Sequence, residues 1–182
     1  MEVERYHIEG LISFVPRRFE DERGVFYESF NLQRFEEMIG QSVQFVQDNV
    51  SHSKKNVVRG LHFQIPPHAQ GKLIRVSQGR VLDVAVDLRT SSPTYGKHVM
   101  VELDSETGRI FWIPEGFAHG FIALEDNTIF NYKCTDYYHP ECEDALLWND
   151  EVLNINWETQ GAILSAKDAE AKSFSDYQSP FK

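Results

Sequence analysis

The chain has 182 residues, which suits one domain spanning 1–182 that can bury a hydrophobic core without disulfides. Its formal net charge of −10 repels a phosphate backbone and argues against a nucleic-acid partner. Only Cys134 and Cys142 carry thiols, too few for a disulfide framework, and no apolar run is long enough to cross a membrane. The N-terminus lacks the pattern of a signal peptide, so we expect a cytoplasmic protein.

The first element that the sequence predicts is a short amphipathic helix. Asn31 is a good N-cap, Phe35, Met38 and Ile39 fall on one face, and Gly40 can end the helix. A second short helix is expected near the C-terminus, over 165–172. Its first residue is a serine, which can cap it.

Strand patterns dominate the middle of the chain. Six β-rich runs are joined in pairs by tight turns: 72–76 with 80–88, 97–103 with 109–113, and 119–124 with 128–135. The first turn, Ser77-Gln78-Gly79, predicts a hairpin. Short strands in succession indicate an all-β antiparallel sandwich or barrel with a few short peripheral helices, and the mouth of a barrel can hold a small ligand. Periodicity alone leaves open a jelly roll, a lipocalin barrel or an immunoglobulin sandwich.

Several polar side chains interrupt these apolar strands at places that would suit a polar cavity. They are Arg59, His62, Gln64, Lys72, His119 and Tyr132. Each alone has an ordinary structural explanation: a solvated charge, a hydrogen-bonded histidine or a packed aromatic. A metal centre would need two or three converging histidines and a carboxylate, and that set is incomplete here, so we expect no metal and no other cofactor.

Longer motifs resemble one known family. They are Arg59-Gly60-Leu61-His62-Phe63-Gln64 with Pro66-Pro67, Gln70 and Lys72-Leu73; Phe19-x-Asp21-x-Arg23-Gly24-x-Phe26-x-Glu28; Gln47-Asp48-Asn49-x-Ser51; 83–89 with 92–96; 113–121; 132–135; and 148–150 through Ile155-x-Trp157. Together they resemble the dTDP-4-dehydrorhamnose 3,5-epimerase family over roughly residues 2 to 170. The resemblance implies a cupin-like jelly roll, a homodimer that exchanges strands, and a dTDP-4-keto-6-deoxyglucose substrate converted on the way to dTDP-L-rhamnose.

The resemblance also implies a catalytic set for proton transfer next to a ketone. His62 matches the base, Asp168 the carboxylate that orients it, Tyr132 the acid on the opposite face of the sugar, and Lys72 the cation near the C4 oxygen. The protons on C3 and C5 are acidified by the C4 ketone, and histidine suits their removal because it titrates near neutrality. A cation at the oxygen would stabilise the charge that develops there.

Further positions match ligand contacts of the family. Arg23 and Arg59 match diphosphate contacts, and Tyr138 matches the aromatic that stacks on thymine. The remaining polar contacts implied are Glu28, Gln47, Asp48, Asn49, His119, Glu143 and Lys167. In a dimer with exchanged strands, Arg23 and Glu28 are expected to serve the neighbouring subunit's site.

Alternative functions stay open at this point. A relative that inverts only C3 or only C5 could keep the same acid and base. A sugar-nucleotide ketoisomerase is less favoured, because that family lacks this tyrosine and these phosphate motifs. A non-catalytic sugar-nucleotide-binding cupin would tolerate loss of His62, Tyr132 and Asp168, and a metal-dependent cupin would lose its activity to a chelator.

Overall fold

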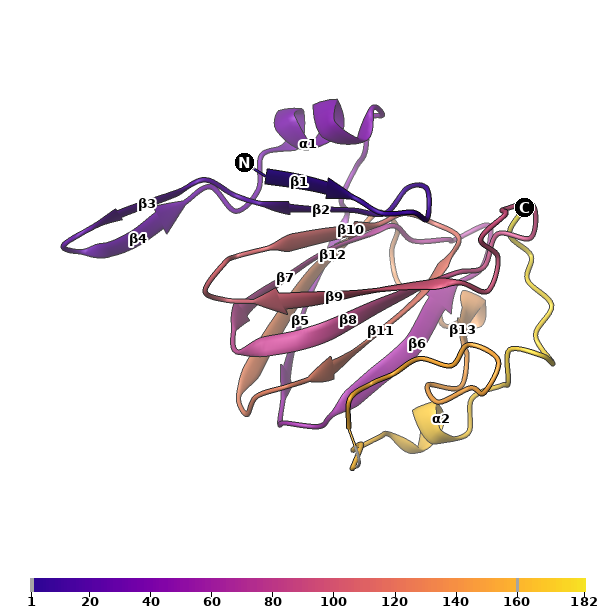
Figure 1. Cartoon of the computed structure of the whole chain (residues 1–182). Helices are drawn as coiled ribbons and strands as arrows, with labels where there is room; N and C mark the ends of the chain where they lie inside the picture. The colour runs from indigo at the N-terminus through magenta and orange to yellow at the C-terminus, as the bar shows by residue number, and fades with distance from the viewer. Residues whose placement is uncertain (1, 160) are drawn as a thin grey trace.

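The computed structural model describes residues 2–159 and 161–182, and within them the strands form two facing antiparallel sheets and a separate hairpin (Figure 1). The first sheet has the order β1 (Glu2–Arg5), β2 (Ile12–Val15), β10 (Ile110–Ile113), β7 (Lys72–Gln78), β12 (Thr128–Cys134), β5 (Gln47–Ser53). The second has the order β13 (Glu143–Ala145), β6 (Val58–Gln64), β11 (Phe117–Ala123), β8 (Arg80–Asp87), β9 (His98–Asp104). The hairpin of β3 (Arg18–Asp21) and β4 (Gly24–Tyr27) projects away from both sheets.

The turn at Gly79 connects the two sheets, so the hairpin predicted there is wrong. β7 pairs with β10 and β12, whereas β8 pairs with β9 and β11. The turns after β9 and after β11 cross between the sheets in the same way. A turn signal does not distinguish a hairpin from a corner, and here Ile74 and Val81 gain burial by packing in one cluster between the sheets. This alternation is the jelly-roll pattern, and the predicted cupin-like all-β fold is confirmed.

Aromatic and branched side chains fill the space between the sheets. Phe121 of β11 stacks on Phe130 of β12 with ring centroids 4.0 Å apart, which ties the second sheet to the first. Phe111, Phe117 and Ile74 belong to the same buried cluster. The apolar packing therefore fixes the spacing of the two walls between which polar side chains can lie.

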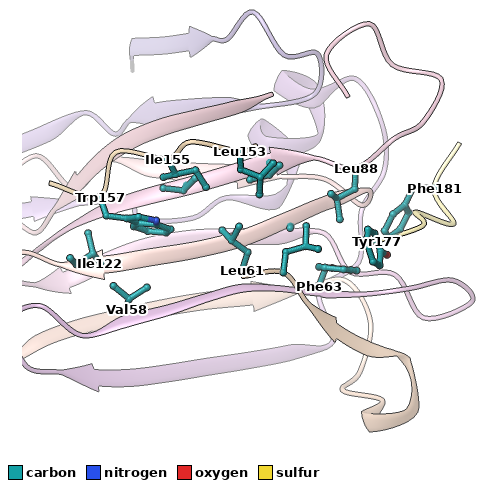
Figure 2. Close-up of a cluster of buried hydrophobic side chains, with 14 of the residues drawn as sticks. Val58, Leu61, Phe63, Leu88, Ile122, Leu153, Ile155, Trp157, Tyr177 and Phe181 are labelled. Atoms are coloured by element: carbon teal, nitrogen blue, oxygen red, sulfur yellow. The ribbon is translucent and has the colours of Figure 1, made fainter. Parts of the chain in front are cut away.

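The outer face of the second sheet is covered by the C-terminal part of the chain (Figure 2). Trp157 lies over Val58 and Ile122, and Tyr177 lies against Phe63 with ring centroids 5.3 Å apart. The aromatic side chains of the segment after Lys172 complete this cluster. The segment is therefore part of the core on that face of the barrel.

Short helices flank the sheets. α1 (Leu32–Ile39) confirms the first predicted helix: the Asn31 side chain accepts a hydrogen bond from the Arg34 amide, and Gly40 ends the helix in a left-handed conformation. Phe35 of α1 packs on Trp112 of the first sheet.

The second predicted helix is shorter than expected. α2 (Ala166–Ala169) has the predicted Ser165 cap but stops before Lys172, because the backbone there forms a β-bridge with Leu146. A 3₁₀ turn, η1 (Pro140–Cys142), precedes β13. In the part of the chain that the structure describes, no helix is long and apolar enough to cross a membrane.

Candidate active site

A bulge in β6 turns two polar side chains toward the interior. Arg59 pairs with Phe121 and His62 pairs with His119, so three steps along β6 correspond to two along β11. Simple alternation would send Arg59 and His62 to opposite faces, and the extra residue places both inside. Gly60 permits this because its backbone has a φ of +134° and a Cβ there would lie 2.5 Å from the Gly120 Cα.

Between the sheets, a cavity of about 340 Å³ opens to the surface. It is lined by side chains from both sheets and from α2: Asn49, Val50, Ser51, Arg59, His62, Lys72, His119, Phe121, Phe130, Tyr132, Glu143, Ser165, Lys167 and Asp168. Nine of the fourteen residues that the sequence analysis singled out as catalytic or ligand-binding are in this lining. The structure thus brings residues that are far apart in sequence into one polar cavity of a size that suits a small ligand.

His62 and Asp168 form a hydrogen-bonded pair in the cavity wall. His62 Nε2 lies 2.5 Å from Asp168 Oδ1, and the backbone amide of Asp168 donates to the hydroxyl of the N-cap Ser165. Burial alone would raise the pKa of Asp168, but the hydrogen bond to His62 and the nearby imidazole charge hold that pKa below its ordinary value. The carboxylate therefore stays ionised and fixes a proton on Nε2, which leaves Nδ1 of a neutral His62 ring able to accept another.

Tyr132 faces the same cavity from β12 in the first sheet, whereas His62 comes from β6 in the second. Tyr132 lies two residues after Phe130 on the same strand, and both side chains line the cavity. Burial raises the pKa of Tyr132 to about 12. The phenol is thus a protonated donor at neutral pH, on the wall opposite the imidazole.

Lys72 is a buried basic side chain in the cavity lining. Its Nζ donates to the His62 carbonyl at 3.2 Å, and burial lowers its pKa, partly offset by Cys134, Asp83 and Glu143. A buried ammonium with one backbone acceptor keeps further donors for a ligand oxygen. The arrangement can stabilise negative charge that develops inside the cavity.

A second histidine–carboxylate pair is buried, and its acidic member was not among the residues predicted from the sequence. His119 Nε2 lies 2.9 Å from Asp83 Oδ2, and both side chains are buried. Burial lowers the pKa of His119 and raises that of Asp83. A signal was available, since Asp83 is a charged residue in the middle of the apolar run 80–88.

Tyr138 and a chain of polar groups border the cavity mouth. The Tyr138 hydroxyl donates to Glu143 Oε2 at 2.7 Å, and Lys167 Nζ lies 2.5 Å from the same oxygen. Burial opposes ionisation of Glu143, but its bonds to Lys167 and Tyr138 keep its pKa low. Gln47 accepts from the Tyr138 amide at 2.8 Å and donates to Asn49 at 3.1 Å. These contacts connect the mouth with the cavity wall.

Besides Gln47 and Tyr138, three residues of the expected ligand set lie outside the cavity lining. Asp48 points to the other face of β5, where it pairs with Lys133 at 3.0 Å, because it alternates with the inward-facing Asn49. Arg23, at the tip of the β3–β4 hairpin, pairs with Asp21 and is 85% exposed. Glu28, just after β4, pairs with Arg34 of α1. Within one chain these side chains do not reach the cavity.

Among residues 2–159 and 161–182, one group of histidine and carboxylate side chains lies close enough together to hold a metal ion: His68, Asp136 and His139. It lies outside the cavity lining. His68 and His139 stack with ring centroids 3.4 Å apart and planes 10° apart, and His68 Nδ1 lies 2.9 Å from Asp136. Ligand lone pairs lie in the ring plane, and two parallel planes share no point where one ion could sit, so this geometry fits packing between loops.

A jelly roll with an imidazole–carboxylate pair, a facing phenol and a buried cation in one cavity defines an acid–base enzyme of the cupin-like class. The family model described as dTDP-4-dehydrorhamnose 3,5-epimerase matches residues 5–176. The chain belongs to the dTDP-4-dehydrorhamnose 3,5-epimerase family, and it is an epimerase.

Individual relatives agree with this assignment. The dTDP-4-dehydrorhamnose 3,5-epimerase of Salmonella typhimurium is 56% identical over 165 residues, 90% of each chain. The crystal structure of a dTDP-6-deoxy-D-glucose-3,5-epimerase from Legionella pneumophila in complex with dTDP-4-keto-L-rhamnose is 47% identical, with a TM-score of 0.95 over 100% of this chain and 98% of that one. A more distant structure, a 3'-monoepimerase from Streptomyces bikiniensis in complex with dTDP-quinovose, is 32% identical, with a TM-score of 0.88 over 93% of this chain and 86% of that one.

Proposed function

We propose that this chain inverts C3 and C5 of dTDP-4-dehydro-6-deoxy-D-glucose to give dTDP-4-dehydro-L-rhamnose, a step of dTDP-L-rhamnose biosynthesis. The observation that carries the proposal is that His62 and Tyr132 line one cavity from opposite sheets. Inversion needs a proton removed from one face of the sugar ring and another delivered to the opposite face. The family name of the chain and its ligand-bound Legionella relative support the choice of substrate.

The first half of the reaction is proton abstraction by His62. Nδ1 takes the proton from the carbon next to the ketone, because Asp168 already occupies Nε2. The electron pair of the broken C–H bond passes into an enolate whose oxygen carries the negative charge. Lys72 is the buried cation that stabilises this oxygen, and the negative charge of Asp168 stabilises the imidazolium that forms.

The second half is proton delivery by Tyr132. The phenol gives its proton to the opposite face of the same carbon, and the C–H bond is rebuilt with inverted configuration. Solvent then returns a proton to Tyr132 and removes one from His62, so no atoms are gained or lost. Presenting C3 and C5 in turn lets one acid–base pair serve both carbons, and no step needs a metal or cofactor.

The nucleotide end of the substrate lies at the cavity mouth in this proposal. Arg59 binds the diphosphate, since a guanidinium fork fits paired oxygens, and Tyr138 stacks on the thymine. Further polar contacts come from the cavity lining and its rim: Asn49, Gln47, His119, Glu143 and Lys167. Because Asp48 faces away, we assign it a supporting role through its bond to Lys133.

The β3–β4 hairpin supports a homodimer in which strands are exchanged. The hairpin projects from the barrel, and its Phe19 and Phe26 are 52% and 72% exposed, so much of their apolar surface is uncovered within the described chain. On a second copy, this hairpin would bring Arg23 and Glu28 to the neighbour's cavity mouth.

Since both cysteines are free thiols and the substrate is a nucleotide sugar, we place the reaction in the cytoplasm.

Turnover of dTDP-4-keto-6-deoxyglucose in deuterated water, coupled to a rhamnose-forming reductase, tests the proposal. Label at both C3 and C5 of the product supports double inversion, whereas label at one carbon favours a monoepimerase such as the Streptomyces relative. His62→Ala and Tyr132→Phe are expected to bind the substrate and to lose at least about a hundredfold in turnover. Turnover like that of the wild type in both variants would exclude this mechanism.

A further inference from the structure

The loop that carries Tyr138 has no sheet ladder to hold it. It connects β12 to η1, and the Tyr138 side chain is 52% exposed at the cavity mouth. Exposed loops of this kind are mobile unless other groups satisfy their backbone. An aromatic ring that must meet a nucleotide base in one orientation therefore needs support from elsewhere in the fold.

Gln64 supplies that support on both sides of Tyr138. Its Nε2 donates to the Tyr137 carbonyl at 3.1 Å, and its Oε1 accepts from the His139 amide at 2.7 Å. A third bond, from Nε2 to the His68 carbonyl at 2.7 Å, fixes the amide itself. Gln64 is 3% exposed, so water does not compete for these bonds.

A second glutamine strengthens the same loop. Gln70 Nε2 donates to the Asp136 carbonyl at 2.8 Å and to the Tyr137 carbonyl at 3.2 Å. The stacked rings of His68 and His139 add a contact between the two loops. Gln64 and Gln70 lie on either side of Pro66-Pro67, and the proline rings restrict the backbone there. The two side chains that hold the Tyr138 loop therefore come from a rigid segment.

We propose that Gln64 is a positioning residue that holds Tyr138 ready for the nucleotide base of the substrate. Gln64 lies two residues after His62 on β6, so one strand sets both the reacting end and the recognition end of the site. Preorganisation of Tyr138 lowers the entropy lost on binding and acts on affinity rather than on proton transfer. The inference rests on the proposed function, in which Tyr138 stacks on thymine.

The test replaces Gln64 with leucine, which removes all three bonds. We expect the dissociation constant for dTDP, by titration calorimetry, and the KM for the sugar nucleotide to rise about tenfold, while kcat stays within about twofold. Gln64→Glu, whose carboxylate would face the His68 and Tyr137 carbonyl oxygens, should raise both constants at least as much as the leucine variant. Gln78→Leu is the matched control, because its amide donates to the Asn127 carbonyl at 3.1 Å in another part of the fold, and its constants should stay unchanged.

A double variant separates positioning from general damage. In a Tyr138→Ala background, Gln64→Leu should weaken dTDP binding by less than about twofold further, since the ring that it positions is gone. A full tenfold loss in that background, or unchanged dTDP binding in Gln64→Leu alone, would overturn the proposal. If Gln64→Leu does not fold, Gln70→Leu takes its place, because Gln70 is only partly buried. Its dTDP affinity is then measured alone and in the Tyr138→Ala background. Failure of the wild type to bind dTDP would instead refute the proposed function.

Discussion

Asp168 Oδ1 lies 2.5 Å from His62 Nε2 although the two residues are 106 positions apart in the chain. The pair forms because the Ser165 cap starts a short helix whose third residue faces β6. The pairing selects one tautomer of His62 and makes the other ring nitrogen the base. Loss of the carboxylate should therefore damage catalysis without emptying the cavity.

Asp168→Asn tests the role of this charge. The amide keeps the size of the side chain but cannot stabilise an imidazolium, so kcat should fall by about a hundredfold while KM changes by less than about threefold. Steady-state kinetics measures both constants. Asp176→Asn is the control, since Asp176 bonds to Ser173 on the exterior and should leave both constants alone. An Asp168→Asn enzyme with the wild-type kcat would show that the carboxylate is only structural.

Tyr132→Phe should separate hydrogen exchange from inversion. The variant keeps His62, so it can still remove a proton and return one from solvent to the same face of the ring. We expect deuterium to enter recovered substrate while formation of the epimer falls by at least about a hundredfold. His62→Ala should abolish both exchange and inversion. Mass spectrometry and proton NMR of the recovered sugar nucleotide read the two processes separately, and equal loss of both in Tyr132→Phe would contradict this assignment of acid and base.

Lys72, rather than Tyr132, should set the alkaline limit of activity. Burial raises the pKa of Tyr132 to about 12, so its phenol stays protonated well beyond pH 10. Burial lowers the pKa of Lys72, opposed by Cys134, Asp83 and Glu143, so its ammonium is the first of the two groups to lose its active form as the pH rises. The plot of log kcat against pH should therefore bend downward on the alkaline side as Lys72 deprotonates.

Lys72→Arg provides the check on that alkaline limb. A guanidinium does not deprotonate in this range. The kcat that remains in the variant should therefore fall at a higher pH than in the wild type, or should not fall at all below about pH 11. The kcat profile of wild type and variant between pH 6 and 11 makes the comparison. An alkaline limb at the same pH in both proteins would assign it to another group.

Much of this site was predictable from the sequence because its residues interrupt apolar strands or fall in long motifs. The cap at Asn31 followed from the local rules of helix capping. The crossing at Gly79 did not, because a turn signal is local whereas the choice of sheet depends on packing between distant strands. Asp83 was missed because its significance depends on His119, which approaches it only in the folded sheet.

The position of Asp48 shows the same limit in another form, because a motif match predicts that a residue contacts ligand but not which face of its strand it occupies. Arg23 and Glu28 lie on or beside the projecting hairpin, and their expected role in a neighbouring subunit's site stays a prediction. Asp48 follows from strand alternation once Asn49 is known to face inward. The motifs identified most of the side chains that share the cavity, but not the packing that brings them together.

Gly60→Ala should damage both stability and activity through the bulge in β6. An added Cβ would lie 2.5 Å from the Gly120 Cα and 2.8 Å from the His119 carbonyl oxygen, and the φ of +134° is unfavourable for alanine. We expect a loss of about 3 kcal/mol in the free energy of unfolding, measured by urea denaturation. Because relief of the clash moves β6 away from β11, Arg59 and His62 should also shift and kcat should fall. Gly161→Ala is the matched control: nothing lies within 4 Å of its added Cβ, so stability and kcat should stay near those of the wild type. A Gly60→Ala protein as stable and active as that control would show that the close approach of the two strands is not what sets the register of the site.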